Sequence, residues 1–404
     1  MKRIRQLLTS GGASSAASSF IAIIVGLVFG FIILLVSNPS QALSGLGVIA
    51  AGGFNGGMKG IGQVLYYATP LIMTGLCVGF AFKTGLFNIG APGQLMVGGF
   101  VAVFVGHNAQ GFIPGWALWI VALLAAMVAG GIWGAIPGFF KAKLNVNVVI
   151  ACIMCNYIGM YGVNYLIKNT NVYDQLKNQT VNVTQAAIPR RGLDKIFFNL
   201  KGNYQDAASV NGGIIIAIVL AIVVYLVLNK TTFGYELKAC GYNRHASQYA
   251  GINESRSILM SMVIAGALAG IGGGLMYLAP ANGLHIRVEE ILSPEGFNGI
   301  PVALLGLSNP IGIIFSGLFI AYISQGGYYL QRLNYMPEII DIIVAAIIYF
   351  SAFSLLVKNV IASAVKKREI RREGTGNDSS FGSAEVSGEE DGARNSAKGG
   401  EVEP

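Results

Sequence analysis

Long apolar stretches alternate with short polar segments along most of the chain. A helix of about 20 apolar residues crosses a hydrocarbon core of roughly 30 Å, because each residue adds about 1.5 Å along the axis. This pattern predicts an all-α integral membrane protein. Nine stretches come close to the required length: 17–37, 63–82, 94–110, 116–139, 147–168, 211–228, 257–280, 311–326 and 338–358.

A further apolar segment, residues 297–308, is too short for an ordinary span, since a helix of this length reaches only about 18 Å. We expect Asn298 to cap this helix and Pro301 to lie in its first turn, where the missing N–H costs nothing. Pro310 should then separate the segment from the next span. Because broken helices at membrane depth lie against protein or a water-filled cavity, the segment is a candidate pathway wall. A re-entrant turn without contact to cargo is the alternative.

Basic residues at both ends of the chain indicate the topology. They gather in segments 1–5 and 366–372, before the first span and after the last. Since Lys and Arg favour the cytoplasmic side, we expect both termini to be cytoplasmic and the number of crossings to be even, about ten. The loop 229–256 then lies inside and the loop 169–210 outside. The outer loop contains five Lys and Arg residues and does not follow the rule.

These considerations divide the chain into three parts. We expect a cytoplasmic N-terminal segment, 1–16, a transmembrane domain, 17–358, and a cytoplasmic tail, 359–404. From about residue 373 the tail is rich in Gly, Ser, Glu and Asp. Such a composition cannot form a core, so we expect the tail to be largely disordered and dispensable, with a regulatory role as the alternative.

Composition supports the membrane interpretation. Charged residues make up 11% of the chain, whereas soluble domains carry about 25%. The formal net charge of +8 does not indicate nucleic acid, because Lys and Arg lie in loops and tails rather than in a patch with aromatic residues. We therefore expect membrane lipid, and no nucleic acid, as a partner.

Small residues recur every fourth position in several spans. Such series let helix backbones approach closely and predict helix-packing faces. The clearest series are Gly130, Gly134 and Gly138, and Gly266, Gly270 and Gly274.

The sequence offers little that could catalyse a reaction. It contains no G-x-x-x-x-G-K-[ST] loop, so we expect no nucleotide hydrolysis by this chain. The three histidines are far apart, and Cys152 and Cys155 lie inside an apolar run without a second pair, which favours helix packing over redox or metal chemistry. We predict no catalytic residue, no metal and no cofactor.

The spans also contain almost no ionisable residues; Glu338 and Asp341 lie at the start of the last one. A proton-coupled carrier normally needs a buried carboxylate or histidine. Energy for transport should therefore come from another chain. A secondary carrier for a neutral solute is the alternative.

The loop 229–256 shows where such energy could enter. A short amphipathic helix is expected at about 243–250, with Ala246, Tyr249 and Ala250 on one face. Gly251 is a suitable terminator in the left-handed region. A small helix in a cytoplasmic loop can contact a partner protein that transmits motion to the membrane domain. An ordinary connecting loop would have a similar sequence.

Four motifs in this order resemble a known family. The segment FGYELKACGYNRHASQYAGIN (233–253) resembles the cytoplasmic coupling region of the permeases in ABC importers for branched-chain amino acids, ribose and nucleosides. FKTGLFNIGAPGQL (82–95), VNVVIACIMCNYI (146–158) and GFNGIPVALLGLSNPIG (296–312) resemble its nucleoside and simple-sugar branch. The similarity covers about residues 20–360. It implies ten helices with discontinuous segments and an inverted internal repeat.

The resemblance also implies partners and a location. Such permeases work in the bacterial plasma membrane with ATP-binding cassette subunits, a second homologous permease and an extracellular substrate-binding lipoprotein. Nucleosides are the favoured small-molecule cargo, and simple sugars or branched-chain amino acids are the alternatives. A structural or receptor membrane protein is disfavoured by the broken helices.

Two sets of candidate residues follow. A neutral nucleoside needs hydrogen-bond partners and flat apolar surface, and uncharged amides and phenylalanine supply both, although the amides could simply tie helices together. The predicted cargo path consists of Asn88, Gln94, Asn147, Asn156, Phe297 and Asn298. The predicted ATPase-coupling surface consists of Lys238, Gly241, Asn243, Ala246, Ala250 and Gly251.

The chain departs from the family pattern at four positions. Pro92 and Val148 stand where the family commonly has glutamate, Pro301 stands for alanine, and Lys238 for arginine. The loss of two carboxylates near the expected pathway bears on the identity of the cargo, not on the fold.

Overall fold

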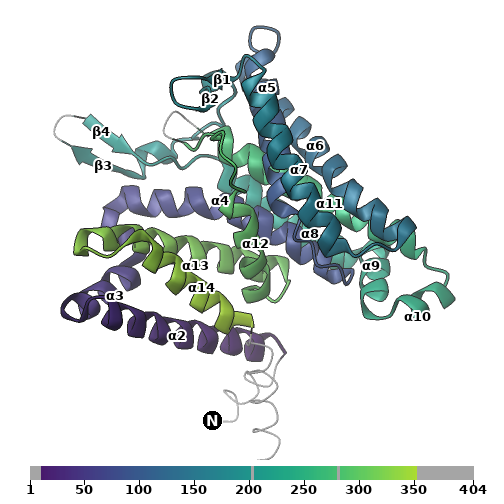
Figure 1. Ribbon diagram of the computed structural model, residues 1–404, viewed down its shortest axis with the longest axis horizontal. Coiled ribbons are helices and arrows are strands. Elements are labelled where there is room, and N and C mark those ends of the chain that lie inside the picture. Colours follow the sequence, from purple (N-terminus) through teal and green to yellow (C-terminus); the bar gives the residue numbers. More distant parts are fainter. Residues whose placement is uncertain (1–10, 202–203, 280–282, 353–404) are drawn as a thin grey trace, which may run out of the picture. The chain divides into compact units, whose positions relative to one another are not determined.

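The computed structural model describes residues 11–201, 204–279 and 283–352. The predicted disordered tail and the first ten residues of the N-terminal segment lie outside these ranges. Figure 1 shows that long helices dominate the described part, whose strands form two short hairpins.

Each of the nine predicted spans contains a helix in its described part. They are α2 (Gly11–Ser37), α4 (Gly57–Lys83), α5 (Ala91–Asn108), α6 (Gly115–Leu144), α7 (Val148–Lys168), α8 (Gly213–Lys230), α11 (Glu254–Tyr277), α13 (Pro310–Tyr328) and α14 (Pro337–Ala352). Among the described residues, six segments are long and apolar enough to cross a membrane by length and composition. The all-α integral membrane fold is confirmed, while ten crossings and the inverted repeat stay predictions.

The short segment begins earlier than predicted. It forms α12 (Pro294–Leu305), so Asn298 is not its cap and Pro301 lies inside the helix. Pro294 takes a first-turn position that suits its fixed φ, and Glu295 lies at the positive end of the helix dipole. The predicted break after the helix is confirmed, because α13 begins at Pro310.

Two regions contain helices that the sequence pattern did not predict. Between α2 and α4 lie η1 (Pro39–Gln41), α3 (Ala42–Ala51) and η2 (Gly52–Gly56). In the loop 229–256, α9 (Thr232–Tyr242) precedes the predicted short helix, α10 (Arg244–Tyr249). Side-chain caps explain where α9 and α10 begin. Thr231 accepts a hydrogen bond from the N–H of Gly234 at the start of α9 (3.1 Å), and Asn243 accepts one from the N–H of Ala246 at the start of α10 (3.0 Å).

The loop 169–210 has regular structure in its described part. Two antiparallel hairpins pair Tyr173 with Thr180 and Phe198 with Ala207. Short 3-10 turns connect them. The elements are β1 (Tyr173–Asp174), β2 (Gln179–Thr180), η3 (Thr184–Ala186), η4 (Leu193–Lys195), β3 (Phe198–Lys201) and β4 (Tyr204–Ala207).

Helix α11 packs against α4, α5 and α6. The predicted glycine faces bring these backbones together: a Cβ added at Gly266 would collide with the carbonyl oxygen of Gly130, and one added at Gly98 would collide with Gly270. The prediction of helix-packing faces is confirmed. A second apolar cluster joins α2 and α3 to α13 and α14, with Leu34, Ile323 and Ile343 buried in it; α2, α13 and α14 lie together in Figure 1.

Helix α4 runs between the β3–β4 hairpin and α9. At its start, Gly56 accepts a hydrogen bond from the side chain of Asn199 in β3 (2.6 Å). After its last residue, Gly85 packs against Gly241 of α9. We refer to these as the hairpin end and the α9 end.

Candidate functional site

A cavity of about 870 Å³ lies at the hairpin end. Its volume falls in the range of about 300–1,000 Å³ that is usual for small-molecule sites. Its walls come from η2, α4, α12, α13, η5 (Tyr329–Leu333), α14 and the β3–β4 hairpin. Its lining includes Asn55, Lys59, Gln63, Tyr67, Leu71, Asn199, Asp206, Glu295, Asn298, Ala321, Tyr328, Tyr329, Arg332 and Asp341.

The cavity follows one face of α4. Lys59, Gln63, Tyr67 and Leu71 line it and are spaced four residues apart, so they share one side of the helix. The distance from the first to the last is about 18 Å along the axis, compared with roughly 30 Å for the hydrocarbon core. The cavity therefore runs along α4 for more than half of a membrane thickness.

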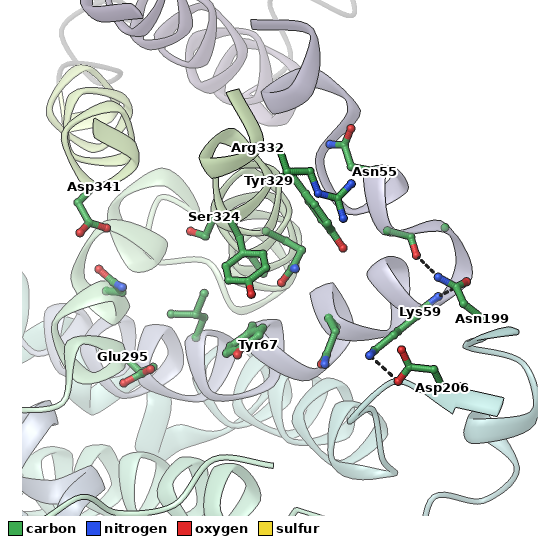
Figure 2. Close-up of a pocket in the computed structure, with 18 residues that line it drawn as sticks. Asn55, Lys59, Tyr67, Asn199, Asp206, Glu295, Ser324, Tyr329, Arg332 and Asp341 are labelled. Atoms are coloured by element: carbon green, nitrogen blue, oxygen red, sulfur yellow. Dashed lines mark hydrogen bonds and ion pairs between the residues drawn. The ribbon is translucent and has the colours of Figure 1, made fainter. Parts of the chain in front are cut away.

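Charges near the start of α4 are already engaged. Lys59 Nζ lies 2.6 Å from Asp206 Oδ1, and the side chain of Asn199 bonds to the backbone at the start of α4 (Figure 2). The guanidinium of Arg332 lies 4.8 Å above the ring of Tyr329. Among the described lining residues, both cations thus have partners.

The other side of the cavity is acidic. Glu295 and Asp341 lie there, away from Lys59 and Asp206 (Figure 2). The hydroxyl of Ser293 donates to Glu295 Oε2 at 2.6 Å and so orients the carboxylate. On α4, one turn after Lys59, Gln63 Oε1 is buried and has no hydrogen-bond donor within the described part of the chain.

Close packing between α4, α12 and α13 closes the floor of the cavity. A Cβ added at Gly299 would lie 2.6 Å from Thr74, and one added at Gly75 would lie 2.6 Å from Val302. Thr74 also donates to the carbonyl oxygen of Glu295 (3.1 Å). No space for a solute separates these backbones.

Three of the predicted pathway residues form a buried network near the start of α5. Asn88 donates to Gln94 Oε1 (3.1 Å) and accepts from the N–H of Gly90 (2.9 Å). Asn156 of α7 accepts from the N–H of Gly93 (3.0 Å) and donates to the carbonyl of Ile89 (2.9 Å). These amides satisfy the backbone of a helix start inside the protein.

Cysteines from neighbouring helices surround the network. Asn88 donates to Cys77 Sγ (3.2 Å), and Cys152 Sγ lies 3.5 Å from Asn88 Oδ1. The four described cysteines are all buried and free. Their contacts agree with the interpretation of Cys152 and Cys155 as packing residues.

The other three predicted pathway residues lie elsewhere. Asn298 lines the cavity, but Phe297 is not among the lining residues. Asn147 is exposed at the α9 end, where it caps α7 by accepting from Val149 N–H (2.9 Å). It borders a smaller cavity of about 390 Å³ together with Lys141 and Arg244. The six residues thus occupy three separate places.

Several cavity residues were missed by the sequence analysis. Lys59 precedes the apolar stretch 63–82 used to locate α4, and Gln63 is its first residue, although their four-residue spacing with Tyr67 is a usable signal. Glu295 lies in the first turn of α12, which the pattern placed too late. Asp341 was noted at the start of the last span, but nothing in the pattern connected it with α4 or α12.

The predicted coupling residues lie together on α9 and α10. Gly241 contacts the backbone of Lys83 and Gly85, while Gly251 has a φ of +80° and open space around it. Lys238 donates to Asn229 Oδ1 (3.4 Å), and Ala246 and Ala250 are exposed. Three exposed tyrosines spaced seven residues apart share these helices: Tyr235, Tyr242 and Tyr249.

The starts of α5 and α12 meet between the cavity and the α9 end. A Cβ added at Gly296 would lie 2.8 Å from Cβ of Pro92, so the start of α12 packs on the start of α5. The cavity, the buried network and the α9–α10 surface are therefore connected through consecutive contacts.

Similar sequences identify the family of this chain. A family model described as the permease component of the branched-chain amino acid transport system matches residues 60–352. The guanosine ABC transporter permease protein NupP of Bacillus subtilis is 38% identical over 348 residues, which cover 86% of this chain and 96% of NupP. The nucleoside ABC transporter permease protein NupB of Lactococcus lactis is 33% identical over 360 residues, covering 87% and 95% of the two chains.

A further relative is named for a different cargo. The glucose ABC transporter permease protein TsgB13 of Haloferax volcanii is 32% identical over 297 residues, covering 72% of this chain and 75% of TsgB13. The family match spans well over half of the chain. The chain therefore belongs to the family of permease components of the branched-chain amino acid transport system and is a multi-pass membrane subunit of an ABC transporter.

Proposed function

We propose that this permease carries nucleosides into the cell. The observation that carries the proposal is the lining of the cavity, in which tyrosine rings stand beside hydrogen-bonding amides and carboxylates. The rings of Tyr67, Tyr328 and Tyr329 offer flat surface for a base, and Asn298, Gln63 and Glu295 offer partners for its polar edges and its sugar. The names of NupP and NupB support the same cargo.

Branched-chain amino acids fit this lining less well. Their side chains need aliphatic surface, and Leu71 and Ala321 are the aliphatic side chains among the described lining residues. Their carboxylate needs a cation, but Lys59 is paired with Asp206 and Arg332 stacks on Tyr329. Simple sugars are the second candidate, favoured by the likeness to TsgB13 and by carboxylates that suit hydroxyl groups.

The orientation follows from charge. Lys141, Lys143, Lys230 and Arg244 lie at the α9 end, which we assign to the cytoplasm of a bacterial cell, with both termini on that side. The hairpin end, and with it the mouth of the cavity, then faces the exterior, where an extracellular binding lipoprotein would deliver cargo. A second homologous permease would complete the membrane part.

Separate ATP-binding cassette subunits would supply energy through α9 and α10, because this sequence contains no G-x-x-x-x-G-K-[ST] loop of its own. The surface there suits a protein partner. Tyr242 is 91% exposed and Tyr249 95% exposed, and aromatic side chains of this kind are what interfaces bury.

The cargo path would begin at Asn298 and continue beyond the closed floor. Asn88, Gln94 and Asn156 lie behind that floor, on the side of the α9 end. Passage would require α12 to move away from Thr74, which would bring the buried amides into contact with the cargo. Asn147 would lie near the cytoplasmic exit.

Uptake by the complete transporter in proteoliposomes tests the proposal. We expect ATP-dependent uptake of labelled guanosine that excess unlabelled nucleoside suppresses and excess leucine does not. Suppression by leucine alone would remove the nucleoside assignment, and suppression by ribose or glucose alone would favour the sugar permease. Uptake that continues without the ATP-binding subunits would favour a secondary carrier.

A further inference from the structure

The acidic side of the cavity is rich in hydrogen-bond acceptors that lack donors. Ser293 donates to one oxygen of Glu295, but within the described part of the chain no donor reaches Oε1. Asp341 has no ion-pair partner among the described residues.

Both carboxylates are open to water, because Glu295 is half-buried and Asp341 is exposed. A ligand that enters the cavity displaces this water and must replace its hydrogen bonds. Glu295 and Asp341 come from two different helices, α12 and α14, and both border the same cavity. A ligand that brings O–H donors into this corner would satisfy them.

The hydroxyl groups of a sugar have this chemistry. Two adjacent hydroxyls can donate to carboxylate oxygens, and hydrogen bonds to ionised acceptors are roughly twice as strong as neutral ones. An anionic solute would be repelled by the pair, and an aliphatic solute would leave the acceptors unsatisfied. The engaged cations Lys59 and Arg332 lie away from this corner, near the start of α4 and on η5.

We propose that Glu295 and Asp341 bind the ribose hydroxyls of the cargo, so that the permease itself distinguishes ribonucleosides from 2′-deoxyribonucleosides. The inference rests on the proposed function. It assigns to the membrane subunit a selectivity that would otherwise belong to the extracellular binding protein alone.

The test compares uptake of guanosine and 2′-deoxyguanosine by the complete transporter in proteoliposomes. Every sample contains the same binding protein, so a change in the ratio of the two rates reports on the permease. Glu295→Gln and Asp341→Asn keep the size of each side chain and remove its charge. We expect each to reduce the guanosine preference roughly tenfold, the effect of losing one charge-assisted hydrogen bond.

Asp206→Asn is the matched control, since Asp206 lines the same cavity but pairs with Lys59. It should slow both nucleosides by the same factor and leave the ratio unchanged. An unchanged ratio in both Glu295→Gln and Asp341→Asn would overturn the inference while leaving nucleoside transport intact. Absence of nucleoside uptake in the wild type would instead remove the proposed function, and this inference with it. Inhibition by a polyamine that disappears in Glu295→Gln would show that the carboxylates serve a cation.

Discussion

At the scale of single residues, two predicted pathway amides have different surroundings. Asn156 bonds to Gly93 N–H and to the carbonyl of Ile89, so it holds two backbone groups at the start of α5. Asn298 lines the cavity, and no hydrogen bond joins its side chain to the described residues. The first residue has a structural task in this conformation, while the second is available to cargo.

Alanine substitutions should separate these tasks. Asn156→Ala leaves two buried backbone groups without partners, at a cost of roughly 1 kcal/mol each. We expect a lower melting temperature and lower abundance in the membrane. Asn298→Ala should leave both unchanged and raise the KM for uptake. A raised KM with normal stability in Asn156→Ala would contradict this division.

His285 provides a pH-dependent contribution at the hairpin end. Burial lowers the pKa of His285 from its ordinary value of 6.5, and the nearby Lys177 lowers it further. Between the lowered folded pKa and the ordinary unfolded pKa, the unfolded chain binds more protons. Stability is therefore fully present above about pH 6.5 and decreases as the pH falls through the folded pKa.

Melting temperatures in lipid nanodiscs at pH 7.5 and pH 5.0 measure this contribution. The wild type should lose more stability on acidification than His285→Gln, which does not titrate. Equal losses in both proteins would show that other groups cause the acid sensitivity.

At the scale of elements, α9 and α10 combine a rigid contact with an exposed surface. Gly241 packs against the backbone that follows α4, so a side chain there would force α9 away from Gly85. Gly251 ends α10 in the left-handed region and has open space around it. A side chain at Gly251 would not collide with other atoms, and its only cost would be the strain of the left-handed backbone.

Gly241→Val should therefore uncouple ATP hydrolysis from uptake. We expect hydrolysis by the assembled transporter to continue while nucleoside uptake falls at least tenfold, because motion of α9 no longer reaches the start of α5. Gly251→Ala is the matched comparison and should reduce uptake by less than threefold. Normal uptake in Gly241→Val would show that the contact between Gly85 and Gly241 does not transmit the motion.

At the scale of the whole described molecule, one series of contacts connects the cavity with the surface for a partner. It passes from Glu295 to Gly296 and Pro92, continues through the amides around Asn88, and ends where Gly85 meets Gly241. The starts of α5 and α12 both lie on this route. A displacement of α9 can therefore reach the floor of the cavity through groups already in contact.

The β3–β4 hairpin is attached to the other end of α4 by the pair of Lys59 and Asp206. Their side chains are 31% and 19% exposed, so the pair is only partly screened by salt. Lys59→Glu should loosen the hairpin and reduce uptake several-fold. The double variant with Asp206→Lys should recover part of the loss, incompletely because Asp206 has further interactions.

Protease cleavage within the hairpin provides an independent measurement. Cleavage should be faster in Lys59→Glu and slower again in the double variant. A double variant that behaves like the sum of its single changes would show that the two charges do not interact.

The sequence by itself determined the membrane-spanning helices and their approximate ends. Lipid requires about 20 apolar residues per crossing, and backbone groups within it must bond inside the helix, so local composition was sufficient. It also determined α10, because Asn243 and Gly251 are strong start and stop signals, and the glycine packing faces of α6 and α11, because repeated glycines permit close contact.

Only the tertiary structure decided where the cavity lies and which residues share it. Lys59 lies more than 200 positions before Glu295 and Asp341, and no local pattern shows that the helices of these three residues meet. The same reason explains why the predicted amides separated into a buried network and a cavity wall: each short motif was recognisable, but its neighbours come from α4, α7 and α12. Contacts between helices decide which side chains share a site, and the apolar pattern of a single helix does not specify its neighbours.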